Sequence, residues 1–254
     1  MRAAVRLPVA EASEGTRSET LARVAEAGFD GVAFADLERR HLRPVAAALG
    51  EAGLEPVSVT VSHDRLQAER KAVVRDLATV GCGRVVVPPV HEAHFETPDA
   101  INRMATRLSA LGGRLATSGQ TLCYRNDTHE FRRIDPPGET DDAAERSLDA
   151  FDLLVERSGE GLAFELDVGA VTAAGRDPAA VLGRLTGRVP LVALRDVDAD
   201  GDPVSLGDGV VDVDVVVDAA REAGVEWLVY GEPVARGSTG SQDGRSGSLD
   251  GELE

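Results

Sequence analysis

Lysine is almost absent from this sequence. Lys71 is the only lysine among 27 basic residues, which face 44 Asp and Glu residues in a chain of 254. The formal net charge is therefore −17. A surface this acidic repels phosphate backbones, so we expect no nucleic-acid partner. An acidic composition with arginine in place of lysine is also typical of proteins from high-salt cells, and it predicts a haloarchaeal source.

Cysteine and long apolar runs are scarce as well. Cys82 and Cys123 both lie inside apolar stretches, which favours packing roles over a disulfide framework. No apolar run reaches the length needed to cross a bilayer, so no membrane partner is expected. The first residues resemble a strand and lack the hydrophobic segment of a signal peptide. These features together predict a cytoplasmic protein.

What the chain does have is a regular alternation of strand-like and helix-like segments. Apolar runs rich in Val, Ile and Leu predict eight strands: Arg2–Pro8, Gly31–Ala35, Glu55–Ser62, Arg84–Val90, Thr121–Asp127, Phe164–Val168, Val189–Asp196 and Trp227–Glu232. Amphipathic spacing between them predicts seven helices: Ser18–Gly28, Leu42–Gly53, Arg65–Val80, Pro98–Ala116, Asp141–Arg157, Asp177–Leu185 and Val213–Gly224.

This alternation favours a parallel β/α fold, and we predict a closed (β/α)8 TIM barrel over residues 1–233. An open doubly wound sheet is the alternative, but no glycine-rich phosphate turn follows the first strand. Residues 234–254 are rich in Gly, Ser and acidic residues, which predicts a disordered tail in place of an eighth outer helix. The outward residues of the last strand, Leu228 and Tyr230, would then lack a cover. We therefore expect a homo-oligomer that buries the strand-eight side.

Two carboxylates occupy one face of the sixth predicted strand. Strand alternation in Phe164–Val168 places Glu165 and Asp167 on the same side and the apolar residues on the other. Two carboxylates are expensive to bury unless a cation or a hydrogen-bond donor lies beside them. This strand is therefore the first place to expect a functional site.

Several segments resemble the sugar phosphate isomerase/epimerase family of xylose isomerase-like TIM barrels. The similar words, in the family's order, are GFDGVAFADL (28–37), VGCGRVVVP (80–88), LCYRNDTHEF (122–131), FELDV (164–168), GRVPLVALRD (187–196) and GDGVVDVDVVVDAAREAGVEWLVYGE (207–232). The resemblance implies a sugar or sugar phosphate substrate and proton transfer through an enediolate. It also implies a divalent metal, Mn, Mg or Zn, that chelates the substrate oxygens.

The metal ligands implied by the resemblance are mostly missing. Asp167 matches a ligand aspartate, and Asn126, Glu130 and Phe131 are retained. The other ligand positions carry residues that cannot bind a hard cation or that depart from the pattern, namely Ala33, Thr60, Arg125, Ala193 and Gly231, and Glu232 falls on the opposite face. We therefore expect the family metal site to be lost and no cofactor to be bound; a divalent metal is the alternative that the resemblance implies.

Arginine replaces the metal ligands at the predicted barrel mouth. Strand parity directs Arg6, Arg125 and Arg195 inward together with Glu165 and Asp167. One interpretation is an anion site in which Glu165 or Asp167 transfers a proton, while Arg6, Arg125, Asn126 and Arg195 bind the substrate. The alternative is a buried Arg–carboxylate network in a catalytically inactive barrel that binds a ligand or a protein partner. A DNA-repair endonuclease of the same superfold is disfavoured by the charge and the missing ligands.

Histidines offer a third possibility. His63, His91 and His94, with His129, follow strands three to five on the catalytic face and could form a relocated transition-metal site.

An acidic loop follows strand seven. The segment Asp196–Gly201 matches the first half of an EF-hand loop, but Gly207 occupies the twelfth position, where a bidentate glutamate belongs. We expect a solvated loop there.

Overall fold

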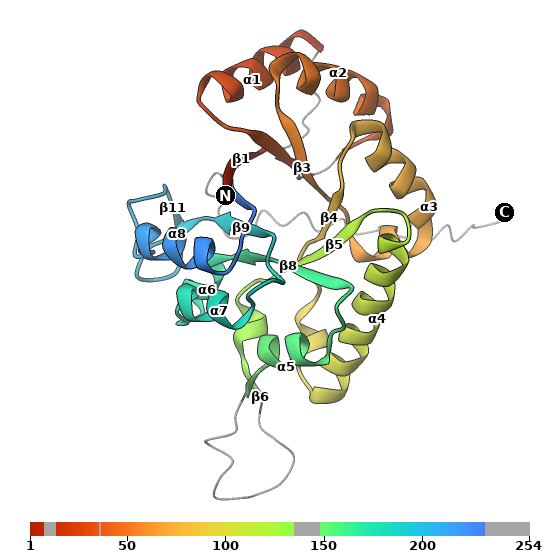
Figure 1. Ribbon diagram of the computed structural model, residues 1–254. Helices are drawn as coiled ribbons and strands as arrows, with labels where there is room; N and C mark the ends of the chain where they lie inside the picture. The colour runs from red at the N-terminus through yellow and green to blue at the C-terminus, as the bar shows by residue number, and fades with distance from the viewer. Residues whose placement is uncertain (8–13, 36, 135–147, 232–254) are drawn as a thin grey trace, which may run out of the picture.

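Eight parallel strands close into a barrel in a computed structural model that describes residues 1–7, 14–35, 37–134 and 148–231 (Figure 1). The order around the barrel is β1-β12-β9-β8-β5-β4-β3-β2, and β2 pairs with β1 to close it. The strands are β1 (Arg2–Leu7), β2 (Gly31–Phe34), β3 (Glu55–Thr60), β4 (Arg84–Val87), β5 (Thr121–Arg125), β8 (Leu162–Asp167), β9 (Leu191–Leu194) and β12 (Trp227–Tyr230). The predicted TIM barrel is confirmed.

Helices surround the strands on the outside (Figure 1). They are α1 (Glu14–Glu26), α2 (Leu42–Ala52), α3 (His63–Val80), α4 (Pro98–Ala116), α5 (Ala150–Arg157), α6 (Val168–Ala173), α7 (Pro178–Arg184) and α8 (Val213–Glu222). Short 3-10 turns precede or replace parts of the connections: η1 (Arg39–His41), η2 (Glu92–Phe95) and η3 (His129–Phe131). None of the helices within the described ranges is both long and apolar enough to cross a membrane.

Polar caps start these helices. The side chains of Ser62, Thr97, Asp149, Asp177 and Asp212 each accept a hydrogen bond from a backbone N–H in the first turn that follows. Those N–H groups have no partner inside the helix, so the caps fix where each helix begins.

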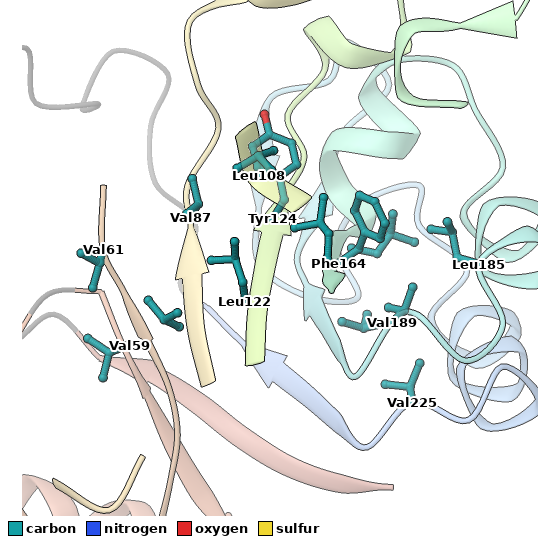
Figure 2. Packing of buried hydrophobic residues seen from close by; sticks show 14 of the residues in the cluster. Val59, Val61, Val87, Leu108, Leu122, Tyr124, Phe164, Leu185, Val189 and Val225 are labelled. Carbon is teal, nitrogen blue, oxygen red and sulfur yellow. The ribbon is translucent and has the colours of Figure 1, made fainter. Parts of the chain in front are cut away.

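The core has two parts. Residues inside the barrel form one cluster: Ala4, Ala33, Val57, Val86, Cys123, Leu191, Trp227 and Val229. A larger cluster lies between the strands and the helices, and it contains Leu122, Tyr124 and Phe164 of the strands and Leu108 of α4 (Figure 2). Cys123 and Cys82 are both buried free thiols, as expected for packing residues.

The last strand follows the predicted parity. Trp227 and Val229 belong to the interior cluster, so Leu228 and Tyr230 face outward, where both are partly buried. The predicted tail, residues 234–254, and Glu232 lie outside the described residues.

Some predicted boundaries are wrong. The helix predicted for Asp141–Arg157 begins only at Ala150, because Leu148–Asp149 pairs as a short strand (β7) with Arg133–Ile134 (β6); residues 141–147 lie outside the described ranges. The strand predicted for Arg84–Val90 ends at Val87, just before two prolines that have no N–H to donate to a sheet. The sequence did not predict α6, a helix of six residues that starts directly after β8.

Candidate functional site

Charged side chains from four strands meet at the carboxyl-terminal end of the barrel. Arg6 comes from β1, Arg125 from β5, Glu165 and Asp167 from β8, and Arg195 follows β9 directly. The register places Arg125 beside Glu165 across the β5–β8 pair. TIM-barrel enzymes carry their active sites at this end, so the strand order brings these five of the six predicted site residues to the expected end of the barrel.

Glu165 lies beneath two guanidinium groups. Arg6 donates a hydrogen bond from Nη2 to Glu165 Oε1, and Arg125 Nη1 lies 3.6 Å from Glu165 Oε2. The carboxylate is 0% exposed, whereas the Arg6 and Arg125 side chains are 14% and 18% exposed. Glu165 Oε2 accepts no hydrogen bond from the described residues, and the Arg125 guanidinium donates none to them. Two groups able to bind a ligand therefore face each other without a hydrogen bond.

Asp167 is held by an ion pair and by a helix. Arg195 Nη2 lies 2.6 Å from Asp167 Oδ2, and the backbone N–H of Ala170 donates to Oδ1 over 3.1 Å. Asp167 is therefore the N-cap of α6. The side chain of Asn126 joins this strand to β5, since its Oδ1 accepts from Asp167 N–H at 2.9 Å and its Nδ2 donates to Asp167 C=O at 3.3 Å. Asn126 is therefore buried and joins the two strands through one donor and one acceptor, and its predicted contact with a substrate stays a prediction.

The charges at the mouth are not equally compensated. Three guanidinium groups pair with two carboxylates, and Asp127 adds a further negative charge that acts on Arg195. Burial and then the Arg6 charge lower the pKa of Arg125, and Glu165 opposes them only in part. Burial also lowers the pKa of Arg195, but the charge and hydrogen bond of Asp167 outweigh it and the net pKa is raised. Arg125 is therefore the cation whose charge is least compensated.

A buried carboxyl group that sequence reasoning gave no role lies beside this site. Glu130 is 0% exposed, accepts a hydrogen bond from the Tyr124 hydroxyl at one oxygen, and accepts the Asp127 N–H over 2.9 Å at the other. Burial raises the pKa of Glu130, although the nearby His129 and these hydrogen bonds oppose the shift. Tyr124 also accepts from the Val90 N–H at 3.3 Å. Glu130 and Tyr124 therefore tie the loop after β4 to the loop after β5, and the only sequence signal was the retained glutamate.

The loop after β9 is mostly exposed or partly exposed, as predicted, but Asp196 at its start is buried. Its carboxylate is buried and accepts four backbone N–H groups: Val197 (2.9 Å) and Val211 (3.0 Å) at Oδ1, Gly207 (2.9 Å) and Gly209 (3.0 Å) at Oδ2. A Cβ atom on Gly209 would lie 2.2 Å from the Val197 carbonyl oxygen, so only glycine fits there. Asp196 is thus the centre of the loop, and the EF-hand-like pattern reflects a structural carboxylate.

The histidine alternative does not assemble. His91 Nδ1 accepts the Ala93 N–H at 3.2 Å and so caps η2, while His63 lies 3.3 Å from Asp64 and 3.0 Å from Gln67. Burial, then the positive charges of Arg107, His63 and His91, lower the pKa of His94. Among the residues described, no three His, Cys, Asp or Glu side chains are placed to hold a metal ion.

The described residues of the mouth do not fit the divalent metal that the resemblance implies. Both Asp167 oxygens already accept from N–H donors, and Glu165 is covered by guanidinium groups. Ala193, in register with Asp167, supplies only a methyl group. A Cβ atom on Gly231 would lie 4.0 Å from Arg6 Cβ, and glycine itself offers no side chain to bind a metal. Positively charged side chains lie where oxygen or nitrogen atoms able to ligate a metal would be needed.

Solved structures with the same fold include sugar-modifying enzymes. A sugar phosphate isomerase/epimerase from Parabacteroides distasonis is similar over 95% of this chain and 88% of its own, with a TM-score of 0.71 and 17% identity. The 3-keto-D-glucoside 4-epimerase YcjR from E. coli is similar over 94% of each chain, with a TM-score of 0.65 and 17% identity. The IolI protein, solved with a bound zinc atom, is similar over 93% of this chain and 90% of its own, with a TM-score of 0.68 and 16% identity.

Sequence comparison gives the family. No curated relative matches the chain. The family model described as "Xylose isomerase-like TIM barrel" matches residues 21–246, which is most of the sequence. Together with the closed eight-stranded barrel and its charged mouth, this match shows that the chain belongs to the xylose isomerase-like TIM barrel family.

Proposed function

We propose that the barrel mouth binds a small anionic sugar, a sugar phosphate or a sugar acid, and transfers a proton on it through an enediolate. The observation that carries this proposal is the state of Arg125. Its guanidinium group reaches the mouth, is partly exposed, and donates no hydrogen bond to the described residues. A guanidinium group binds carboxylates and phosphates through two parallel N–H bonds, so Arg125 is a donor pair without an acceptor.

Arg6 and Arg195 complete the proposed anion site. Each has a buried Nε that donates to no residue in the described ranges, although its terminal nitrogen pairs with a carboxylate. The three guanidinium groups cover the carboxylates, so an entering ligand meets positive charge first. A carboxylate or phosphate group at the mouth would then accept hydrogen bonds from donors that have no acceptor among the described residues, and it would reduce the repulsion between Arg6 and Arg125.

The same residues support the proposed proton transfer. Removal of a proton from a carbon next to a carbonyl places negative charge on oxygen, and positive donors held in position stabilise that charge. Glu165 is the candidate base, because its Oε2 accepts no hydrogen bond from the residues that the structure describes. Its burial means that the ligand must draw Arg6 and Arg125 away before Glu165 can act. A ligand that takes over their hydrogen bonds would do this.

A binding module without turnover is the second candidate. The observation that favours it is the burial of Glu165 at 0% exposure beneath two arginines, which keeps the base from a ligand unless they move. Both candidate functions require that the mouth binds an anion, but only the enzyme transfers a proton on the bound ligand.

The experiment combines a binding screen with an exchange assay. Thermal shift with a set of sugar phosphates, sugar acids and neutral sugars should show stabilisation by anions only. Arg125→Gln should weaken that binding by roughly tenfold or more, yet leave the ligand-free Tm almost unchanged because Glu165 retains Arg6. Arg132→Gln, an exposed arginine near the same strand end, is the matched control and should bind as the wild type does.

Proton transfer is then tested directly in D2O. Deuterium should enter the carbon next to the carbonyl of the bound sugar, detected by NMR, and Glu165→Gln should abolish the exchange. Binding without exchange favours the second candidate. The absence of any stabilising anion would refute the proposed site.

A further inference from the structure

The outer side of α3 carries a hollow whose charge is opposite to that of the chain. It has a volume of about 510 Å³ and is lined by residues 67–72 and 75 together with Arg39 of η1. The helix is bent there, since Glu69 has non-helical angles of φ −122° and ψ 21°. Four lining residues are basic and one is acidic, in a protein of net charge −17. The hollow is therefore a local region of positive potential.

One of the four cations already has partners. Arg39 donates from Nε to Asp76 Oδ2 over 3.0 Å, and its Nη2 lies 3.7 Å from Glu69 Oε2. These contacts hold the guanidinium in place at the edge of the hollow. Arg39 is thus fixed at the edge of the hollow, and its charge is largely balanced by Asp76 and Glu69.

The other three cations are uncompensated. The side chains of Arg70, Lys71 and Arg75 make no ion pair or hydrogen bond with any residue that the structure describes, whereas other basic residues of the region do, such as Arg65 with Asp76. Lys71 and Arg75 are four residues apart on the same side of the helix. Like charges at this spacing repel each other and slightly destabilise the helix. A bound polyanion would turn that repulsion into attraction.

We propose that this hollow binds a condensed phosphate, either free or as the tail of a nucleotide. Three uncompensated cations match an anion of at least three charges better than a single phosphate group. No aromatic side chain is present among the described residues that line the hollow, so nothing there can stack on a base. The phosphate chain is therefore the recognised part. Recognition here is separate from the barrel mouth and does not depend on the proposed sugar site.

The composition of the chain supplies a direct probe. Lys71 is the only lysine, so an amine-reactive acylating reagent modifies one side chain, and peptide mass spectrometry separates that product from the terminal amine. Tripolyphosphate should slow the acylation of Lys71 in a saturable way. The acylation is measured at the lowest ionic strength at which circular dichroism shows that the full chain is folded, because salt screens exposed charges. Orthophosphate should protect only at higher concentration.

Variants test the assignment of the cations. Arg75→Gln should raise the concentration of tripolyphosphate that gives half-protection roughly fivefold, at the upper end of what an exposed ion pair contributes. Arg114→Gln, which removes one exposed charge from α4, should leave it unchanged, and so should Arg125→Gln at the mouth. All three positions are at the surface or partly exposed, and a thermal melt confirms that each variant is folded.

The outcomes separate the sources of the ligand. Equal protection by tripolyphosphate and magnesium-free ATP supports recognition of the phosphate chain. Protection by ATP without protection by tripolyphosphate would overturn it. A lack of saturable protection by either, or an equal loss in Arg75→Gln and Arg114→Gln, would overturn the site as a whole. Neither result would bear on the proposed sugar site, because Lys71 does not report on the mouth.

Discussion

Asp196 provides the sharpest test of how the loop after β9 is held. Replacing it with alanine removes the acceptor of four backbone hydrogen bonds at once. Hydrogen bonds to a charged group contribute about 1.5–3 kcal/mol each, and a loop regains part of this by relaxing and admitting water. The expected loss in the free energy of unfolding is therefore on the order of 3–5 kcal/mol. That is a large share of the stability of a typical domain.

Urea denaturation measures this loss through Trp227, the single tryptophan, which is buried inside the barrel. Asp196→Ala should lower the midpoint at an unchanged m value. Asp196→Asn should cost less, because one oxygen of the amide still accepts two of the four N–H groups. Asp200→Ala is the matched control: it removes the same charge from an exposed position of the same loop and should stay within about 0.5 kcal/mol of the wild type.

The pH dependence has a definite sign. Burial raises the pKa of Asp196, but the four N–H donors outweigh it, and the net pKa lies below the ordinary 3.8. A carboxyl group whose folded pKa is lowered stabilises the fold above its unfolded pKa and loses that contribution as the pH falls through the folded value. The difference between wild type and Asp196→Ala should therefore be constant near neutral pH and shrink below about pH 4. A difference under about 1 kcal/mol at pH 7, or one that grows on acidification, would refute this account.

Three other measurements test the site and its surroundings. Chelators should leave the Tm unchanged and Mn²⁺ should not raise it, since the Asp167 oxygens already have donors; a Mn²⁺-dependent rise that Asp167→Asn abolishes would contradict this. Tyr124→Phe should lower the free energy of unfolding by about 2 kcal/mol, because Glu130 loses its hydroxyl donor, whereas Tyr230→Phe should have little effect in the same denaturation assay. Light scattering should detect a homodimer or larger assembly both for the full chain and for a chain truncated after Ala235. A monomer in both cases would refute the expected interface at β12, the eighth strand of the barrel.

The positions of the strands were predictable because each is a short apolar run between turns. Their ends were less so, and backbone hydrogen bonding gives the reason. Pro190 has no N–H, and β9 begins only at Leu191. The sequence does not predict α6 because its six residues are small or β-branched. Its only start signal is the N-cap Asp167, which the sequence pattern also assigns to the site.

Strand parity predicted which charges face inward, but it could not predict how they pair. Arg6 and Glu165 belong to β1 and β8, which are separated in the barrel by β12 and β9. Their contact depends on the diameter and closure of the barrel, properties of the whole chain that no local pattern contains. The role of Glu130 was hidden for a similar reason, since its side chain turns back from η3 to meet Tyr124 of the preceding strand.

The pairing of these charges determines what the mouth can do. Arginine holds its charge throughout the accessible pH range and offers only donors. Arg195 pairs with Asp167 and Arg6 pairs with Glu165, so neither guanidinium group can coordinate a cation, and Arg125 remains the cation with the least compensated charge. Ala193, in register with Asp167, has a methyl side chain that cannot ligate a metal ion. On the proposed function, a substrate here would contact guanidinium groups, so selectivity would come from its negative charge and from the geometry of N–H donors. This constraint makes the anion screen the decisive first experiment on the mouth.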